Sequence, residues 1–404
     1  MKLLEPISAW SHEIAAIRRD LHAHPELAFE ETRTADQVAH WLQQWDIPVH
    51  RGLGVTGVVG VLKGTGGEGP SIGLRADMDA LPMQELNEFA HKSRHDGKMH
   101  ACGHDGHTAM LLGAARYLSE HRDFAGTIHL IFQPAEEGFG GAREMIRDGL
   151  FERFPMQAVF GLHNWPGMPA GTFGVLPGAM MASSNTFEIR IEGKGAHGGM
   201  PNLGVDPVVT AVQLAQSLQS IVSRNVDPLE PVVLSITQIH AGSADNVIPN
   251  EAVMRGTVRT FSVQALDLVE QRMRELAEHT CAAFGCKAEF DFDRRYPPTI
   301  NDPGQAAFCA QVIRELVGED RLRQDIRPSM GAEDFSFMLQ EVPGCYVWLG
   351  NGDGDHRSQG HGMGPCMLHN GSYDFNDALI PVGASYWVKL ALDWLRQHRS
   401  PSML

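Results

Sequence analysis

The sequence predicts an α/β protein in which a mainly parallel sheet carries helices on both faces and is interrupted by an inserted ferredoxin-like α+β domain. Two observations predict this class. Short apolar runs alternate with helical periodicities on both sides of the middle of the chain, a pattern typical of parallel sheets covered by helices. In the middle the order of elements changes to β-α-β-β-α-β, the ferredoxin-like order. A chain of 404 residues is also too long for one small core.

The first part of the chain alternates helical and extended segments. Val38, Trp41, Leu42 and Trp45 follow helical spacing. The segments expected after them are strands at 55–62 and 72–74, a helix at about 108–120, a strand at 127–132, a helix at 142–148 and a strand at 158–162. Ligand sites in such sheets lie beyond the carboxyl ends of the strands, so polar residues that follow these strands are the first candidates for a site.

The middle segment is expected to form the inserted domain. Its elements are a strand at 186–192, a helix at 207–223, strands at 232–239 and 252–260, a helix at 263–284 and a strand at 287–293. Tyr296, Pro297 and Pro298 end the last strand, because proline cannot continue a ladder of hydrogen bonds. We therefore predict a catalytic domain from 1–182 and 297–404, with the insertion at 183–296.

Composition excludes several functions. The formal net charge of −16 argues against a nucleic-acid partner, because phosphate binding needs concentrated Lys and Arg. No run approaches the roughly 18 apolar residues of a membrane span, and the first residues lack the apolar core of a signal peptide. Six cysteines in so long a chain do not suggest a disulfide scaffold. A cytoplasmic protein fits these features.

The stretch His100–His107, HACGHDGH, is the densest group of chemically active residues. Cys102 and His104 stand two residues apart with glycine between them, so both can bend onto one metal ion. Alternatively, Cys102 is a nucleophile with a histidine base, or the stretch is a polar loop that caps the following helix. The density of these residues favours a site, with metal binding ahead of nucleophilic chemistry.

Carboxylates and a histidine follow three further strands. Asp77 and Asp79 come after the second strand, where aspartate also commonly caps turns. Glu136 and Glu137 are adjacent, and burying both is costly without nearby cations. Either they lie on a solvated turn, or one binds metal while the other moves protons. His163 ends the strand at 158–162, beside the other strand ends, which favours a ligand over a structural histidine.

Candidates elsewhere are weaker taken singly. His356, His361 and His369 lie late in the chain, and spacing cannot choose a ligand among them. In the insertion, a glycine-rich turn carries His197, and Asn246 and Arg259 are further polar candidates, with surface or capping roles as the alternative.

Taken together and in order, these stretches resemble the hippurate hydrolase, aminoacylase and auxin-conjugate amidohydrolase family of binuclear metallohydrolases. The motifs that carry the resemblance, which covers nearly the whole chain, are RDLHAHPEL at 19–27, RADMDALP, HACGHDGH, QPAEEG, GKGAHGG, MGAEDF at 330–335 and LHN at 368–370. It implies metal ligands at Cys102, His104, Glu137, His163 and His369, with Cys102 bridging two ions. In the wider carboxypeptidase-like superfamily a histidine stands where this chain has Asp77, which leaves the role of Asp77 open.

The resemblance also implies catalytic roles. Glu136 is the expected general base, and His197 is expected to reach a neighbouring subunit's active site. Asp79 is expected to be an acid that orients a ligand imidazole, that of His104, through the ring nitrogen that does not bind metal. Asn246 and Arg259 are expected to contact substrate. The inserted domain is the expected lid or dimerisation domain of a homodimer.

The expected reaction is metal-dependent hydrolysis of the amide bond of N-acyl amino acids, with two divalent ions per chain. A thiolate beside imidazoles favours zinc, carboxylates also admit manganese, and cobalt or nickel remain possible. The rivals are a dipeptidase or carboxypeptidase that uses the same metals, and a metal-free thiol hydrolase that uses Cys102.

Overall fold

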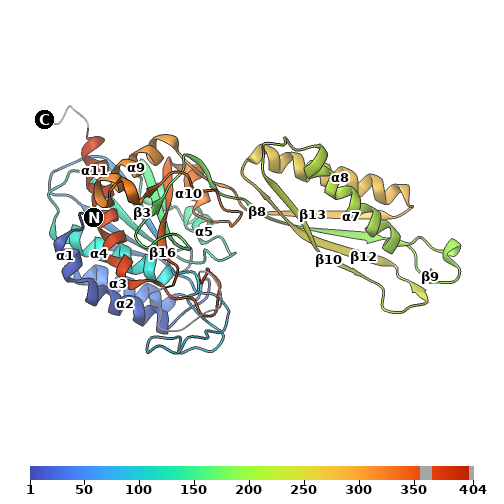
Figure 1. Cartoon of the computed structure of the whole chain (residues 1–404), viewed down its shortest axis with the longest axis horizontal. Helices are drawn as coiled ribbons and strands as arrows, with labels where there is room; N and C mark the ends of the chain where they lie inside the picture. The colour runs from blue at the N-terminus through green and yellow to red at the C-terminus, as the bar shows by residue number, and fades with distance from the viewer. Residues whose placement is uncertain (355–365, 400–404) are drawn as a thin grey trace. The chain divides into compact units, whose positions relative to one another are not determined.

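The structure is a computed structural model that describes residues 1–354 and 366–399, and the chain forms two compact units (Figure 1). The second unit comprises Met181–Thr299 and Pro328–Glu333, and the first comprises the remaining segments. From the sequence alone the insertion is expected at 183–296. The short return of the chain to the second unit at Pro328–Glu333 has no counterpart in that expectation.

The first unit is built on one large sheet. Among the described residues it has eight strands in the order β1-β2-β4-β3-β5-β16-β6-β15. The strands are β1 (Val49–Leu53), β2 (Gly57–Lys63), β3 (Ser71–Asp77), β4 (Thr127–Gln133), β5 (Ala158–Pro166), β6 (Phe173–Gly174), β15 (Leu322–Arg323) and β16 (Gly344–Gly352). β4, β3, β5 and β16 are parallel neighbours, whereas β1 with β2, β2 with β4, and β6 with β16 pair antiparallel. The predicted mainly parallel α/β sheet is confirmed.

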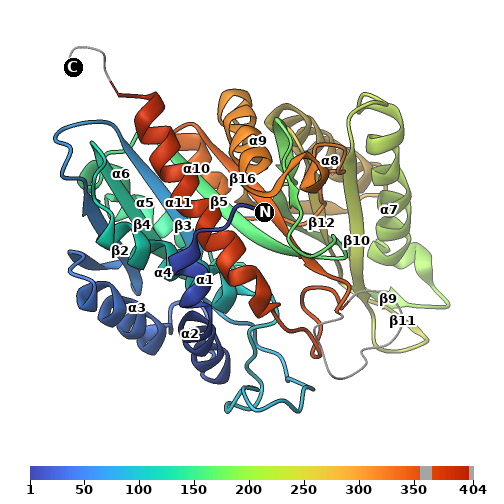
Figure 2. The same ribbon diagram turned by 60° about the vertical axis from the view of Figure 1, so that its left-hand side comes forward.

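Helices cover this sheet. They are α1 (Glu5–Ala9), α2 (Ser11–Ala23), α3 (Thr32–Gln44), α4 (His104–Glu120), α5 (Gly141–Arg147), α6 (Leu150–Arg153), α9 (Pro303–Val317), α10 (Ser336–Glu341) and α11 (Ile380–Gln397). α4 and α11 pack against each other and against β3 (Figure 2). α5 packs on β4, and α10 packs on α5.

The alternation of side chains along β4 explains why both faces must be covered. Ile128, Leu130 and Phe132 belong to the large hydrophobic cluster that includes α4 and α11. Ile131 points to the opposite face and is also fully buried, as is Gln133 on the same face. A strand that is buried on both faces is typical of a parallel sheet between two layers.

Several elements extend beyond the ranges predicted from the sequence, and the extensions of β3, β5 and α4 carry site residues. β3 continues to Asp77 because Arg75, which interrupts the apolar run, is buried and paired with the Asp77 carboxylate at 2.7 Å. α4 begins at His104 rather than near Thr108. Gly103, with φ of +94°, turns the chain into the helix in a conformation that glycine adopts without strain.

β16 was not predicted from the sequence. It is buried along almost its whole length and lies beside β5, with Trp348 opposite His163. Its sequence, GCYVWLGNG, contains three glycines, which weaken the usual strand signal.

The second unit has the predicted β-α-β-β-α-β order. β8 (Ser184–Glu192), α7 (Pro207–Arg224), β10 (Val232–Ala241), β12 (Glu251–Thr260), α8 (Val263–Ala283) and β13 (Lys287–Tyr296) follow in sequence. The strands form an antiparallel sheet in the order β10-β12-β8-β13, and α7 and α8 pack on it around a separate hydrophobic core. In neither unit does the described part of the chain contain a helix long and apolar enough to cross a membrane.

Candidate active site

The carboxyl ends of three neighbouring parallel strands bring the sequence-predicted residues of the first unit together. β3 ends at Asp77, β4 leads into Glu136 and Glu137, and β5 carries His163. The loop before α4 adds Cys102, and α4 itself begins with His104. Sheet topology therefore collects residues from stretches far apart in the sequence at one edge of the sheet.

Cys102 lies among several possible metal ligands. Its Sγ atom is 3.3 Å from Nε2 of His163. Cys102, Glu137 and His369 each offer a ligand atom within 4.8 Å of the others, and so do His104, Glu136 and Glu137. His369 Nε2 is 3.1 Å from Glu137 Oε1. Four of the five expected ligands thus lie in two overlapping groups that share Glu137, and the fifth, His163, lies beside Cys102.

Hydrogen bonds orient two of the imidazoles. Nδ1 of His104 donates to Asp79, at 2.9 Å to the backbone oxygen and 3.2 Å to Oδ1. Nδ1 of His163 donates to the backbone oxygen of Asn164 at 2.6 Å. Each ring therefore turns Nε2 toward the site, the arrangement that metal-binding histidines usually show.

The buried Nε2 atom of His104 has no hydrogen-bond partner within 1–354 and 366–399. Burial alone would lower the pKa of His104, but the carboxylates of Asp77 and Asp79 raise it to about 10. The site is therefore negative enough to hold a proton on a buried imidazole. A divalent cation would supply the same charge compensation, so the residues present fit a metal ion.

The electrostatics of Cys102 and Glu137 agree with a cation site. Burial and the carboxylates of Glu137 and Glu136 raise the pKa of the Cys102 thiol well above its usual value. Burial alone would raise the pKa of Glu137, but its hydrogen bond with His369 and the charge of His104 hold it below the ordinary value. Without a cation the thiol stays protonated, which disfavours the reading of Cys102 as an activated nucleophile.

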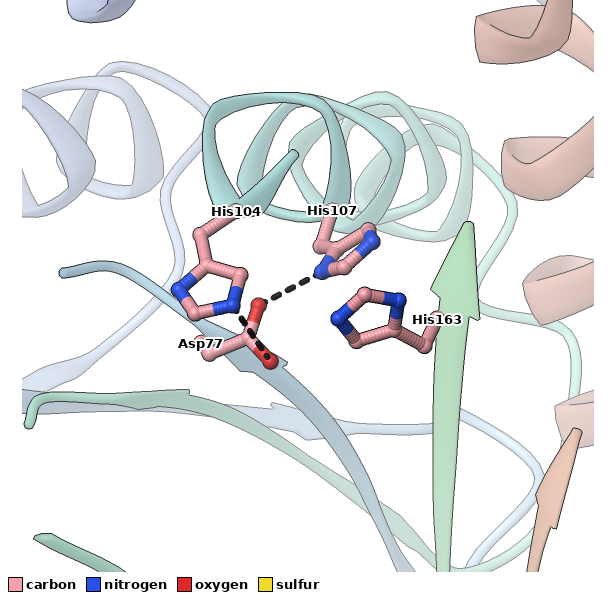
Figure 3. A group of neighbouring side chains, drawn as sticks. All are labelled: Asp77, His104, His107 and His163. Atoms are coloured by element: carbon pink, nitrogen blue, oxygen red, sulfur yellow. Dashed lines mark hydrogen bonds and ion pairs between the residues drawn. The ribbon is translucent and has the colours of Figure 1, made fainter. Parts of the chain in front are cut away.

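A second cluster, shown in Figure 3, consists of Asp77, His104, His107 and His163. Asp77 accepts from Nδ1 of His107 at 2.6 Å and from Arg75 at 2.7 Å. His107 Nε2 accepts the backbone N–H of Asn164 at 2.9 Å. Because hydrogen bonds engage Asp77 and both nitrogens of His107, these two residues support the site rather than offer free ligand atoms. These hydrogen bonds give Asp77, whose role the sequence left open, the role of holding His107 and Arg75 in place.

Asn164 joins several parts of the site. Its side-chain Nδ2 donates to the backbone oxygen of Cys102 at 2.7 Å, and its Oδ1 accepts from the hydroxyl of Tyr373 at 2.6 Å. Its backbone oxygen accepts from His163, as described above. One fully buried amide thus links the Cys102 loop, the end of β5 and the segment that follows His369.

Comparison with known proteins decides the family. The model for peptidase family M20/M25/M40 matches residues 73–393. The chain belongs to this peptidase family. It is 42% identical to a hippurate hydrolase of Campylobacter jejuni over 98% of this chain and 100% of that protein, and 39% identical to an N-acetylcysteine deacetylase of Bacillus subtilis over 95% and 97%. A solved dinuclear metal-binding peptidase of the M20 family from Bacillus subtilis matches with a TM-score of 0.83 at 36% identity, covering 96% of this chain and 99% of that one.

The M20 membership and the donor set together support a metal-binding hydrolase. The resemblance recognised from the sequence is confirmed, and so is the assignment of the chain as an amidohydrolase-type enzyme.

Three further predicted residues lie in the second unit. His197 is exposed on β9 (Ala196–His197), which pairs with β11 (Val247–Ile248) next to Asn246. The backbone N–H of Gly198 donates to the oxygen of Asn246 at 2.7 Å, so His197 and Asn246 share one turn region. Arg259 lies near the far end of β12 and donates to Thr257 Oγ1 at 2.6 Å. Burial and the nearby Arg295 lower its pKa. His356 and His361 lie outside the described residues.

Sequence reasoning missed several supporting residues of this M20 site. Asn164 follows a predicted ligand directly and could have been singled out by that position. Arg75 and Asp334 stand in two of the motifs that carry the resemblance but receive no role from the sequence, although the two form a buried ion pair at 3.1 Å. An arginine within a buried strand is a usable signal, because a buried charge needs a partner.

Proposed function

We propose that this chain hydrolyses the amide bond of N-acyl amino acids and releases a carboxylic acid and a free amino acid. The observation that carries the proposal is the grouping of Cys102, Glu137 and His369 beside Glu136 and His104, whose Nε2 atom has no hydrogen-bond partner in the described site and lies 3.7 Å from Oδ2 of Asp77. The similarity to a hippurate hydrolase and an N-acetylcysteine deacetylase supports this substrate class, because the substrate stated in each of these names is an N-acyl amino acid.

We assign Cys102, His104, Glu137, His163 and His369 as ligands of two divalent cations, with Cys102 shared. Bound there, the cations would lower the pKa of a water molecule and polarise the scissile carbonyl. Zinc is favoured by the thiolate and imidazoles, and manganese is the main alternative.

Within this proposal Glu136 moves the protons. Its carboxylate accepts a proton from the attacking water and passes it to the nitrogen of the departing amine, which restores the carboxylate for the next turnover. Asp79 is a positioning residue: it holds the His104 ring by Nδ1 and also accepts the backbone N–H of Glu137 at 2.9 Å. The same carboxylate therefore orients one proposed ligand and the peptide of another.

A carboxypeptidase or dipeptidase using the same metals is the second candidate. Hydrolysis rates for N-benzoylglycine, N-acetylcysteine and a free dipeptide, measured side by side, separate the two. We expect the blocked substrates to be cleaved with the higher kcat/KM. A clear preference for the free dipeptide would reject the N-acyl assignment and leave the metal assignment standing.

We propose a cytoplasmic homodimer formed through the second unit. Val209 and Val212 on the outer surface of α7 are 48% and 57% exposed, which supports an association surface on this unit.

Asn246 and Arg259 are proposed substrate contacts. His197 of the partner subunit is proposed to stabilise negative charge that develops on the carbonyl oxygen.

The proposed sharing of His197 between subunits predicts complementation. His197→Ala and Glu136→Gln variants should each be inactive, yet mixed subunits should regain activity, because a hybrid dimer contains one site with both native residues. The measurement is hydrolysis of N-benzoylglycine after mixing, with subunit exchange checked by a mass-tagged partner. Exchange without recovery of activity would place His197 in its own subunit's site or outside catalysis.

A further inference from the structure

The turn that presents Glu136 and Glu137 contains a strained residue. Ala135 has a φ of +54°, a left-handed conformation that residues with a Cβ atom rarely adopt, and it is completely buried. Such a conformation persists only where the surroundings enforce it. The residues that hold this turn therefore control where the two glutamates point.

Two buried carboxylates hold the peptide N–H groups on either side of Glu136. Oε1 of Glu31 accepts the N–H of Ala135 at 2.8 Å, and Oδ2 of Asp79 accepts the N–H of Glu137 at 2.9 Å. The Asp79 contact belongs to the site already described. The Glu31 contact comes from a segment over a hundred positions earlier in the chain, at the start of α3.

Glu31 is an unusual residue to place there. It is fully buried, its Oε2 accepts from the hydroxyl of Thr56 at 2.6 Å, and no Lys or Arg pairs with it in the described part of the chain. Burial and the nearby Asp79 raise its pKa to about 7. Stability alone does not favour a buried carboxylate without a cation, which points to a role in the geometry of the turn.

We propose that Glu31 is a positioning residue that holds the Ala135 peptide in its left-handed conformation and thereby aims Glu136 and Glu137. The inference rests on the roles proposed above for these two glutamates. Glu31 does not touch the reacting atoms and acts through the backbone alone.

The test compares Glu31→Leu, Glu31→Gln and a matched control in the full-length, metal-loaded protein. Leucine removes the acceptor while filling the space. Glutamine keeps an oxygen for the N–H of Ala135 and can donate its amide to Thr56, so it should preserve the turn. The control is Glu26→Leu: the Glu26 carboxylate also accepts backbone N–H groups, at Arg33 and Thr34, but its side chain does not touch the turn.

Three readouts are measured: amide hydrogen exchange of residues 134–138, metal affinity, and kcat with KM for N-benzoylglycine. We expect Glu31→Leu to speed exchange in this segment and to lower metal affinity and kcat by roughly 10–100-fold, with KM changed far less. Glu31→Gln and Glu26→Leu should stay close to the native protein in all three. Adding Ala135→Gly to Glu31→Leu should recover part of kcat, because glycine adopts a positive φ without strain.

The proposal would be overturned if Glu31→Leu showed native amide hydrogen exchange at residues 134–138 and native kcat. It would also be overturned if Glu31→Leu and Glu26→Leu lost metal affinity and kcat to the same extent. If Glu31→Leu does not fold, Glu31→Asp replaces it, since the shorter carboxylate cannot reach Ala135 and the same losses are expected. Exchange and metal affinity need no substrate. Absence of amidase activity would therefore count against the proposed function and leave this inference to be decided by the other two readouts.

Discussion

Replacing Glu136 with glutamine is expected to lower kcat by roughly 10²–10⁴-fold, the usual contribution of a general acid–base residue. The amide has nearly the same shape but cannot accept the water's proton or return it to the leaving amine. Glu136 is nearly buried beside Glu137 and His104, so the change alters proton transfer without opening the site. Bound metal should stay near the native level, because Glu136 is not among the proposed ligands.

The matched control is Glu152→Gln, an exposed glutamate on α6 that should retain native kcat. Metal content and kcat for N-benzoylglycine are measured on the same preparations. Substantial activity in Glu136→Gln would reject its role as the base. Loss of metal together with activity would instead assign Glu136 as a ligand.

Replacing Cys102 with alanine is expected to remove bound metal. Its Sγ atom lies beside His163 and within reach of Glu137 and His369, so one substitution withdraws a ligand atom from both proposed cations. The loss of affinity should exceed the roughly 10–100-fold that follows removal of a residue that only orients a ligand. The remaining carboxylates would then face one another without a compensating cation, which is unfavourable in a buried site.

Metal per chain is measured after equilibration with a weak competing chelator, with Cys281→Ala as the control. Cys281 is also a buried free thiol but belongs to the core of the second unit. Cys281→Ala should keep its metal. If Cys102→Ala keeps full metal occupancy but loses activity, and alkylation of the native thiol also abolishes activity, the thiol hydrolase alternative would have to be preferred.

Much of the fold could be predicted from the sequence because local patterns dictate it. The apolar run of β4 and the helical periodicity of α7 are read directly from spacing. β3 extends beyond its predicted end because Arg75 and Asp77, which interrupt its apolar pattern, are buried together, and the ion pair of Arg75 with the distant Asp334 contributes to making that burial possible. No local window contains that partner.

In the site, too, some residues are predicted by local sequence patterns and others are not. Cys102, His104 and the adjacent glutamates stand out by density, and the structure collects them at one edge of the sheet. The supporting contacts could not be predicted, because they join distant segments. Glu31 reaches Ala135 across 104 positions, and the hydroxyl of Tyr373 reaches Asn164 across 209. Such pairs depend on topology, which spacing along the chain does not encode.

The most direct test of the account is hydrolysis of N-benzoylglycine by protein stripped with a chelator and then resupplied with zinc or manganese. The metal bound per chain is determined at each step. We predict that activity disappears with the metal and returns as two ions bind per chain. Full activity after complete removal of bound metal would contradict the central claim that this site is a two-metal amidohydrolase centre.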